Sequence, residues 1–432
     1  MPTTGDQPVT DMSDAAARVL ATIDDRREAM MRSLADFVRV PSVSGSDAEN
    51  EAIHLVAGLM GDQGLDVDHW QIPLGEVSGL ADFPGMEVDR TEAWGVVGLL
   101  PGHGNGRSLM LNGHVDVVPP GDPAKWSASA FEPRVADGRM YGRGTCDMKA
   151  GVIASLWAAD AIRRAGVSLR GDLVVAAVLG EEDGGLGTFA TLQRGWRADA
   201  CVIPEPTDLD LVPANAGALT FRLHVHGHAT HASRRTSGVS AIEKFVPIHQ
   251  AIIELEAERN RDAVVSSKFP LAYPVSIGTI TAGDWASSVP DLLVAEGRFG
   301  VALDEPPEVA REALEAAVSR ACAADPWLRD HPVTVEWWGG QFASGRLPDG
   351  TGLLEQMSAA HLAVSDTKQD TWVAPYGSDL RLMTGIGGVP TIQYGPGDVA
   401  LAHGPDEHVV LADVLTTARA LALLALDICG IA

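Results

Sequence analysis

Two different successions of strand-like and helical segments limit the folds open to this chain. In the first half, apolar runs at 94–100, 108–112 and 172–179 alternate with helical patterns at 150–165 and 187–194. Strands that alternate with helices predict an α/β domain whose sheet is covered on both faces. After Ala214 the order changes to strand, helix, strand, strand, helix, strand, which is the order of a ferredoxin-like module.

We therefore expect an α/β protein, with a larger three-layer domain built on a mixed sheet and an inserted ferredoxin-like α+β domain. The predicted boundaries are 1–216 for the first part of the larger domain, 217–338 for the insert, and 339–432 for the second part. Apolar stripes also predict one helix at 14–37 and a buried helix at 411–428. The apolar stretch inside the last helix is far shorter than the ~20 residues of a membrane span.

Charge and cysteine content narrow the classes of function. The 432 residues include 32 Lys and Arg against 58 Asp and Glu, so the net charge is −26. Nucleic acid and anionic membranes are disfavoured as partners, because both attract clusters of basic side chains and the basic runs here are no longer than pairs. A polar, acidic N-terminal segment and four scattered cysteines predict a cytoplasmic protein with reduced thiols.

Side chains that commonly bind metal ions follow several of the apolar runs. His114 and Asp116 lie two positions apart after the strand at 108–112, and at that spacing they face the same side of an extended chain. Asp147 opens a helix after a glycine-rich turn. Read alone, Asp147 is better explained as a helix N-cap than as a metal ligand.

The other candidates lie further along the chain. Three adjacent acids begin at Glu181, Glu205 stands between two prolines, and His403 precedes Gly-Pro. Loops at strand ends carry the binding sites of α/β sheets. Two histidines and three carboxylates there suit two zinc-like ions, with one carboxylate bridging them.

Seven segments carry a resemblance to a known family: GHVDVVP, GRGTCDMKAG, GEEDGG, PEPT, GHATHAS, YGSDLR and AHGPDE. In this order the chain resembles, over essentially its whole length, the zinc-dependent family of aminoacylase, acetylornithine deacetylase, succinyl-diaminopimelate desuccinylase and glutamate carboxypeptidase. The resemblance implies a hydrolase with two Zn²⁺ ions, for which Co²⁺ or Mn²⁺ can substitute. It also implies that the larger domain is catalytic and that the insert is a lid or dimerisation domain through which a homodimer forms. A cis peptide bond between Asp147 and Met148 is implied as well.

The resemblance further implies a set of metal ligands. His114 and Glu205 bind one ion, Glu182 and His403 bind the other, and Asp147 bridges the two.

Other residues receive catalytic or binding roles from the same resemblance. Glu181 is the general base that activates water at the metal site, and Asp116 orients His114. His231 reaches the site of a neighbouring subunit and supports the oxyanion. Arg298 and Arg381 are implied to bind substrate, and Arg298 is expected to grip a substrate carboxylate.

The implied reaction is cleavage of the amide bond of an N-acyl amino acid or a related N-acyl amine, as in deacetylases and desuccinylases. A metallo-dipeptidase or carboxypeptidase with the same site is the alternative, and no residue separates the two. A non-catalytic binding relative is expected to lack a ligand or the base, yet this chain has all of them. A dehydrogenase is disfavoured, because no G-x-G-x-x-G segment opens a helix after a strand.

Overall fold

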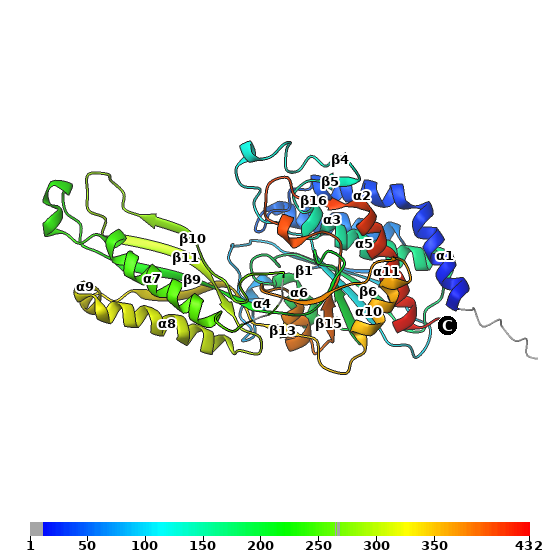
Figure 1. The fold of residues 1–432 in the computed structure, drawn as a ribbon. Helices are drawn as coiled ribbons and strands as arrows, with labels where there is room; N and C mark the ends of the chain where they lie inside the picture. The colour runs from blue at the N-terminus through cyan, green and yellow to red at the C-terminus, as the bar shows by residue number, and fades with distance from the viewer. Residues whose placement is uncertain (1–11, 264, 266–267) are drawn as a thin grey trace, which may run out of the picture.

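The computed structural model describes residues 12–263, 265 and 268–432. Two large sheets dominate it: a nine-stranded mixed sheet in the larger body, and a four-stranded antiparallel sheet in a part that projects from that body (Figure 1). Each has its own hydrophobic core. The α/β class predicted from the sequence is therefore confirmed.

The nine-stranded sheet has the strand order β1-β2-β6-β3-β7-β15-β8-β13, with β14 paired to β8. The central pairs β3/β6 and β3/β7 are parallel, whereas β1/β2 and β2/β6 are antiparallel. Every residue of β3 and β6 is buried, which explains their nearly continuous apolar sequences. The strands are β1 (Asp66–Gln71), β2 (Trp94–Leu100), β3 (Leu109–His114), β6 (Leu173–Val178), β7 (Ala200–Ile203), β8 (Leu211–Asn215), β13 (Gly345–Arg346), β14 (Thr371–Ala374) and β15 (Thr391–Gln393).

Helices enclose this sheet, and the mostly apolar α5 and α11 pack against each other and against α1. The helices of this body are α1 (Met12–Asp25), α2 (Arg27–Arg39), α3 (Asp47–Asp62), α4 (Leu74–Val77), α5 (Ala150–Arg164), α6 (Leu186–Gln193), α10 (Leu353–Leu362) and α11 (Leu411–Cys429). A small three-stranded sheet lies at its surface: β4 (Arg134–Ala136), β5 (Arg139–Tyr141) and β16 (His408–Val410).

The projecting part contains β9 (Gly217–His226), α7 (Ala241–Arg259), β10 (Val275–Ala282), β11 (Leu292–Val301), α8 (Pro307–Ala324), the short helix α9 (Pro326–Asp330) and β12 (Thr334–Phe342). Its sheet has the antiparallel order β10-β11-β9-β12. Alternate residues of β9 are buried against α7 and α8 and the others are largely less buried, as an amphipathic strand requires. The predicted boundaries at 216 and 338 remain predictions; β12 itself continues to Phe342.

The apolar C-terminal helix buries 12 of its 19 residues, most of them in the larger core. Within the described ranges, no helix has both the length and the apolar character needed to cross a membrane.

Candidate active site

The ends of three parallel strands bring the predicted metal-binding residues together. His114 is the last residue of β3, Glu182 follows β6, and Glu205 follows β7. Since parallel strands end at the same edge of a sheet, their following loops meet there. Two groups of side chains result, His114–Asp147–Glu205 and Asp147–Glu182–His403, each with ligand atoms within 4.8 Å of one another.

Asp147 stands between the two groups and belongs to both. Its Oδ1 lies 3.1 Å from Nε2 of His114, and its Oδ2 lies 3.4 Å from Nε2 of His403. Glu205 Oε2 is 3.9 Å from His114 Nε2, and Glu182 Oε2 is 3.2 Å from His403 Nε2. Each carboxylate oxygen of Asp147 thus faces a different histidine. The peptide bond between Asp147 and Met148 is cis, as predicted.

A buried ion pair fixes Asp147 and His403 relative to each other. The backbone N–H groups of Cys146 and Asp147 donate to Glu407 Oε1, at 2.9 and 3.2 Å. Arg143 pairs with the other oxygen of Glu407 and donates to the carbonyl of His403 at 3.2 Å. Both residues of the pair are buried, and burial raises the pKa of Glu407 to about 7. The sequence analysis assigned no role to these two residues, although Arg143 lies in the motif GRGTCDMKAG and Glu407 in AHGPDE.

Asp116 contacts His114, but mainly through its backbone. The Nδ1 atom of His114 is 3.0 Å from the carbonyl oxygen of Asp116 and 3.7 Å from its carboxylate. Because a carbonyl can only accept, Nδ1 carries a hydrogen, and Nε2 is the ring nitrogen that faces Asp147. The Asp116 carboxylate instead accepts the backbone N–H groups of Glu181 and Glu182, both at 3.2 Å, and the Ser44 hydroxyl at 3.0 Å. Asp116 therefore connects the first histidine to the acidic segment.

The electrostatics of this cluster favour a cation. The Glu182 carboxylate is the main reason that the pKa of His403 is raised to about 11. Burial raises the pKa of Glu205 well above its usual range, whereas the two histidines outweigh burial at Asp147 and lower its pKa. Glu182 Oε1 is buried with no hydrogen-bond partner among the described residues. Imidazole nitrogens and carboxylate oxygens are the donors that zinc accepts, so the residues fit the metal.

Glu181 belongs to neither group of potential ligands. It is nearly buried, and burial raises the pKa of its carboxyl well above the ordinary value. The segment Glu181–Asp183 begins three residues after the end of β6, and all three of its residues line the cavity described next. A carboxyl group of raised pKa that is not a potential ligand is a candidate for proton transfer.

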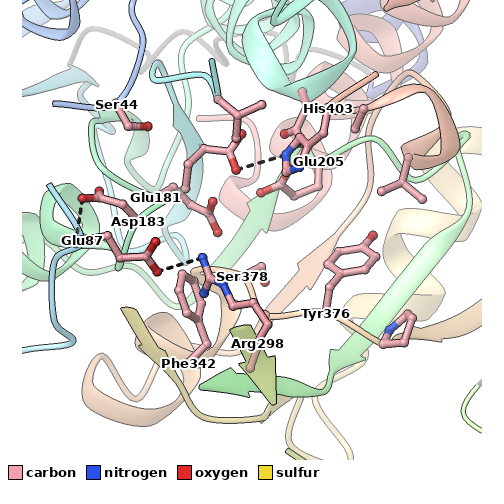
Figure 2. Close-up of a pocket in the computed structure, with 18 of the residues that line it drawn as sticks. Ser44, Glu87, Glu181, Asp183, Glu205, Arg298, Phe342, Tyr376, Ser378 and His403 are labelled. Atoms are coloured by element: carbon pink, nitrogen blue, oxygen red, sulfur yellow. Dashed lines mark hydrogen bonds and ion pairs between the residues drawn. The ribbon is translucent and has the colours of Figure 1, made fainter. Parts of the chain in front are cut away.

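A cavity of about 630 Å³ opens beside the cluster. Figure 2 shows Glu181, Glu205 and His403 on its wall, together with Tyr376, Phe342 and Arg298. The hydroxyl of Tyr376 is buried and has no partner among the described residues. The sequence analysis missed Tyr376, although it directly precedes the GSD of the motif YGSDLR.

The three remaining predicted residues are placed differently from one another. Arg298 lines the cavity, where its Nη2 lies 2.9 Å from Oε1 of Glu87. Arg381 does not line it, which differs from the predicted contact with substrate. Its guanidinium donates to the carbonyls of Gly184 and Ser378, at 2.7 and 3.1 Å, and lies 3.9 Å from the ring centroid of Phe342. Arg381 thus supports a wall residue from behind.

His231 lies outside the cavity of its own chain. It is exposed, and its Nδ1 is 2.7 Å from the hydroxyl of Ser233. A single chain therefore does not bring His231 to the cluster, and its predicted role in a neighbouring subunit stays a prediction.

An α/β sheet that gathers two histidines and three carboxylates at its strand ends, with a buried glutamate beside them, has the arrangement of a metal-dependent hydrolase. The chain belongs to peptidase family M20/M25/M40, whose family model matches residues 110–427. It is therefore a metallopeptidase-family hydrolase that acts on amide bonds, which confirms the family expected from the motifs.

Individual relatives span most of the chain. The N-formyl-4-amino-5-aminomethyl-2-methylpyrimidine deformylase of Halalkalibacterium halodurans is 26% identical, over 93% of this chain and 95% of that protein. The succinyl-diaminopimelate desuccinylase of Polynucleobacter necessarius is 29% identical, over 72% of this chain and 79% of its own. The structure of the di-peptidase Dug1p from Saccharomyces cerevisiae matches with a TM-score of 0.76 at 13% identity, over 95% of this chain and 98% of that one. At that identity the likeness shows the fold alone.

Proposed function

We propose that this chain is a dinuclear zinc amidohydrolase that removes the acyl group from an N-acyl amino acid or a related N-acyl amine. The observation that carries the proposal is the position of Asp147, whose two carboxylate oxygens face His114 at 3.1 Å and His403 at 3.4 Å. Glu205 and Glu182 complete the two groups. Three protein ligands at each ion leave a position for water or substrate, as catalytic zinc requires. Co²⁺ or Mn²⁺ can take the place of zinc.

In this proposal the metal ions and the residues around them have different chemical roles. Zinc ions lower the pKa of water and polarise an amide carbonyl. Glu181 takes the proton of the attacking water and delivers it to the leaving amine. Tyr376 offers an unpartnered hydroxyl on the cavity wall, and such a donor suits the oxygen on which negative charge develops.

Removal of an acyl group is favoured over dipeptide hydrolysis. Two relatives that span most of the chain are named for removing formyl and succinyl groups. The formyl amine in the first name carries no carboxylate. The likeness to dipeptidases rests on the fold alone.

A substrate panel tests this proposal. We expect N-formyl, N-acetyl or N-succinyl amines to be hydrolysed faster than dipeptides by protein that is stripped with a chelator and reloaded with zinc, cobalt or manganese. The stripped protein should be inactive, because the residues alone supply no Lewis acid. Faster cleavage of dipeptides would support the alternative, and full activity without metal would contradict the dinuclear site.

We also propose that the chain acts as a homodimer through the part that contains β9–β12. Ile242, Val246 and Ile253 form an exposed apolar stripe on α7, and Ile280 is exposed on β10. β10 is an edge strand of its sheet and contacts α7. An apolar stripe beside an open strand edge fits a second copy of the chain. In such a dimer, His231 serves the partner's cavity.

Mixed dimers give a specific prediction. His231→Ala and Glu181→Gln homodimers should both be nearly inactive. A co-expressed, doubly tagged heterodimer has one complete site, built from Glu181 of one chain and His231 of the other. It should therefore regain about half of the wild-type activity, because a two-fold dimer has two equivalent sites.

The exposed His331 on the same part provides the control, since His331→Ala should leave activity unchanged. A heterodimer as inactive as its parents would contradict a role for His231 across the interface.

A further inference from the structure

An acidic side chain of the protein is paired with Arg298, the arginine that was expected to bind a substrate carboxylate. Glu87 and Arg298 share one wall of the cavity, with 2.9 Å between Oε1 and Nη2. Figure 2 shows the pair beside Phe342, away from His403. A guanidinium fork is the natural partner of a substrate carboxylate, and here one of its nitrogens is already paired with a carboxylate of the protein.

Only one of the two carboxylate oxygens of Glu87 is used by the protein. Oε1 forms the ion pair with Arg298, and it accepts hydrogen bonds from the hydroxyl of Thr220 at 2.8 Å and the backbone N–H of Gly340 at 3.4 Å. No described residue donates a hydrogen bond to Oε2. Glu87 lines the cavity and is only partly buried. One acceptor oxygen is therefore available to a molecule in the cavity.

Hydrogen bonds and ion pairs connect the loop that carries Glu87 to the acidic segment Glu181–Asp183. Its backbone N–H donates to Oδ2 of Asp183 at 3.1 Å. Arg90, three residues later, is buried between Asp183 and Glu49, with distances of 2.8 Å to each. Gly339 packs against the Glu87 side chain so closely that a Cβ there would overlap it. Glu87 thus has a fixed position relative to Glu181, two residues before Asp183.

The part of the cavity wall formed by Glu87 and Arg298 carries no net charge. The acids of the cluster face the metal site, and Glu87 and Arg298 neutralise each other. Val88, Pro274 and Phe342 supply apolar surface around the pair. A substrate carboxylate brought to this wall would meet the Glu87 carboxylate, and such like-charge contact discriminates against a ligand.

We propose that Glu87 determines specificity: it selects N-acyl amines whose leaving group is a flat, uncharged heteroaromatic ring with N–H donors, such as an aminopyrimidine, and it rejects leaving groups that carry a carboxylate. The ring packs on the apolar wall, and its amino group donates to Oε2. Arg298 holds Glu87 in place. This inference rests on the proposed function, because it names the amine that the site releases.

Three N-formyl probes with the same acyl group test the inference on the zinc-loaded protein: the N-formyl derivatives of 4-amino-5-aminomethylpyrimidine, benzylamine and 3-(aminomethyl)benzoate. We expect kcat/KM for the aminopyrimidine to exceed that for the benzyl probe by about 10–100-fold, the range that a hydrogen bond to a charged group supports. The benzoate probe should be the poorest substrate. In Glu87→Gln, the aminopyrimidine should lose about tenfold, the benzoate should improve, and the benzyl probe should not change.

Glu296→Gln is the matched control. Glu296 lies on the same strand as Arg298 and pairs with Arg222 at 2.7 Å, but it does not line the cavity. Its substitution should leave the ratios among the three probes unchanged. An equal loss for all three probes in Glu87→Gln would mean that Glu87 only joins the two parts of the molecule. A wild-type preference for benzoate that disappears in Arg298→Gln would show that Arg298 grips carboxylates, and would overturn the inference.

Calorimetric binding of the three free amines separates this inference from the proposed function, since binding requires no turnover. If no probe is hydrolysed but the aminopyrimidine binds tightest, and less tightly to Glu87→Gln, then the proposed function fails and the role of Glu87 stands. If all probes are hydrolysed and neither rates nor binding distinguish them, the proposed function stands and the role of Glu87 is refuted.

Discussion

Replacing Glu181 by Gln should lower kcat by about 10²–10⁴-fold while the protein keeps its full metal content, because general base catalysis contributes about that much. Glutamine has the size of glutamate, so the backbone hydrogen bond from residue 181 to Asp116 can persist. Glu181 also lies outside both groups of potential metal ligands. Turnover and metal content are measured on the same preparation, the latter by atomic absorption.

The neighbouring residue supplies the comparison. Glu182→Gln should lose metal as well as activity, because Glu182 lies 3.2 Å from His403 and belongs to the second group. Loss of metal from Glu181→Gln, or near-normal turnover in it, would contradict its role as a base. If Glu181→Gln loses metal and Glu182→Gln does not, Glu181 is the metal ligand and Glu182 the base.

The sequence predicted the fold well where a segment is long and periodic. The apolar run at 94–100 coincides with β2, and the helix expected at 411–428 is α11 within one residue. The stripe at 14–37 is instead split, since α1 ends at Asp25 and α2 begins at Arg27. The buried apolar residues of α1 continue at helical spacing into α2. The pattern of hydrophobic residues therefore does not reveal the break at Arg26.

Strands of three to five residues escaped the prediction for a different reason. β7, β8, β14 and β15 are too short to show a period of their own. Their extended conformation depends on pairing with strands that are distant in sequence, such as β15 with both β7 and β8.

Some residues of the candidate site could be predicted from sequence motifs, and others only from the structure. Motifs found His114, Asp147, Glu182, Glu205 and His403, and the structure brings their side chains together. No motif contains Glu87, because its partners Thr220, Arg298 and Gly340 come from three strands of the other sheet. The motif YGSDLR contains Arg381, but only the packing against Phe342 reveals that this arginine lies behind the cavity wall.

Removing the carboxylate of Asp147 should cost the protein both metal ions at once. Asp147→Ala leaves His114 and Glu205 at one position and Glu182 and His403 at the other. Two protein ligands are one fewer than the three that catalytic zinc sites use, so neither position should hold its ion. We expect the metal content to fall from about two ions per chain to about zero, and activity to fall with it.

Single histidine variants distinguish a bridge from two separate ligands. His114→Ala and His403→Ala each remove a ligand from one position only, so each should retain about one ion per chain under mild dialysis. Glu312→Gln, an exposed acid on α8, should retain both. Metal content measured after identical dialysis checks the series. An Asp147→Ala protein that keeps one tightly bound ion would falsify the bridge, because a carboxylate that serves a single ion cannot release two.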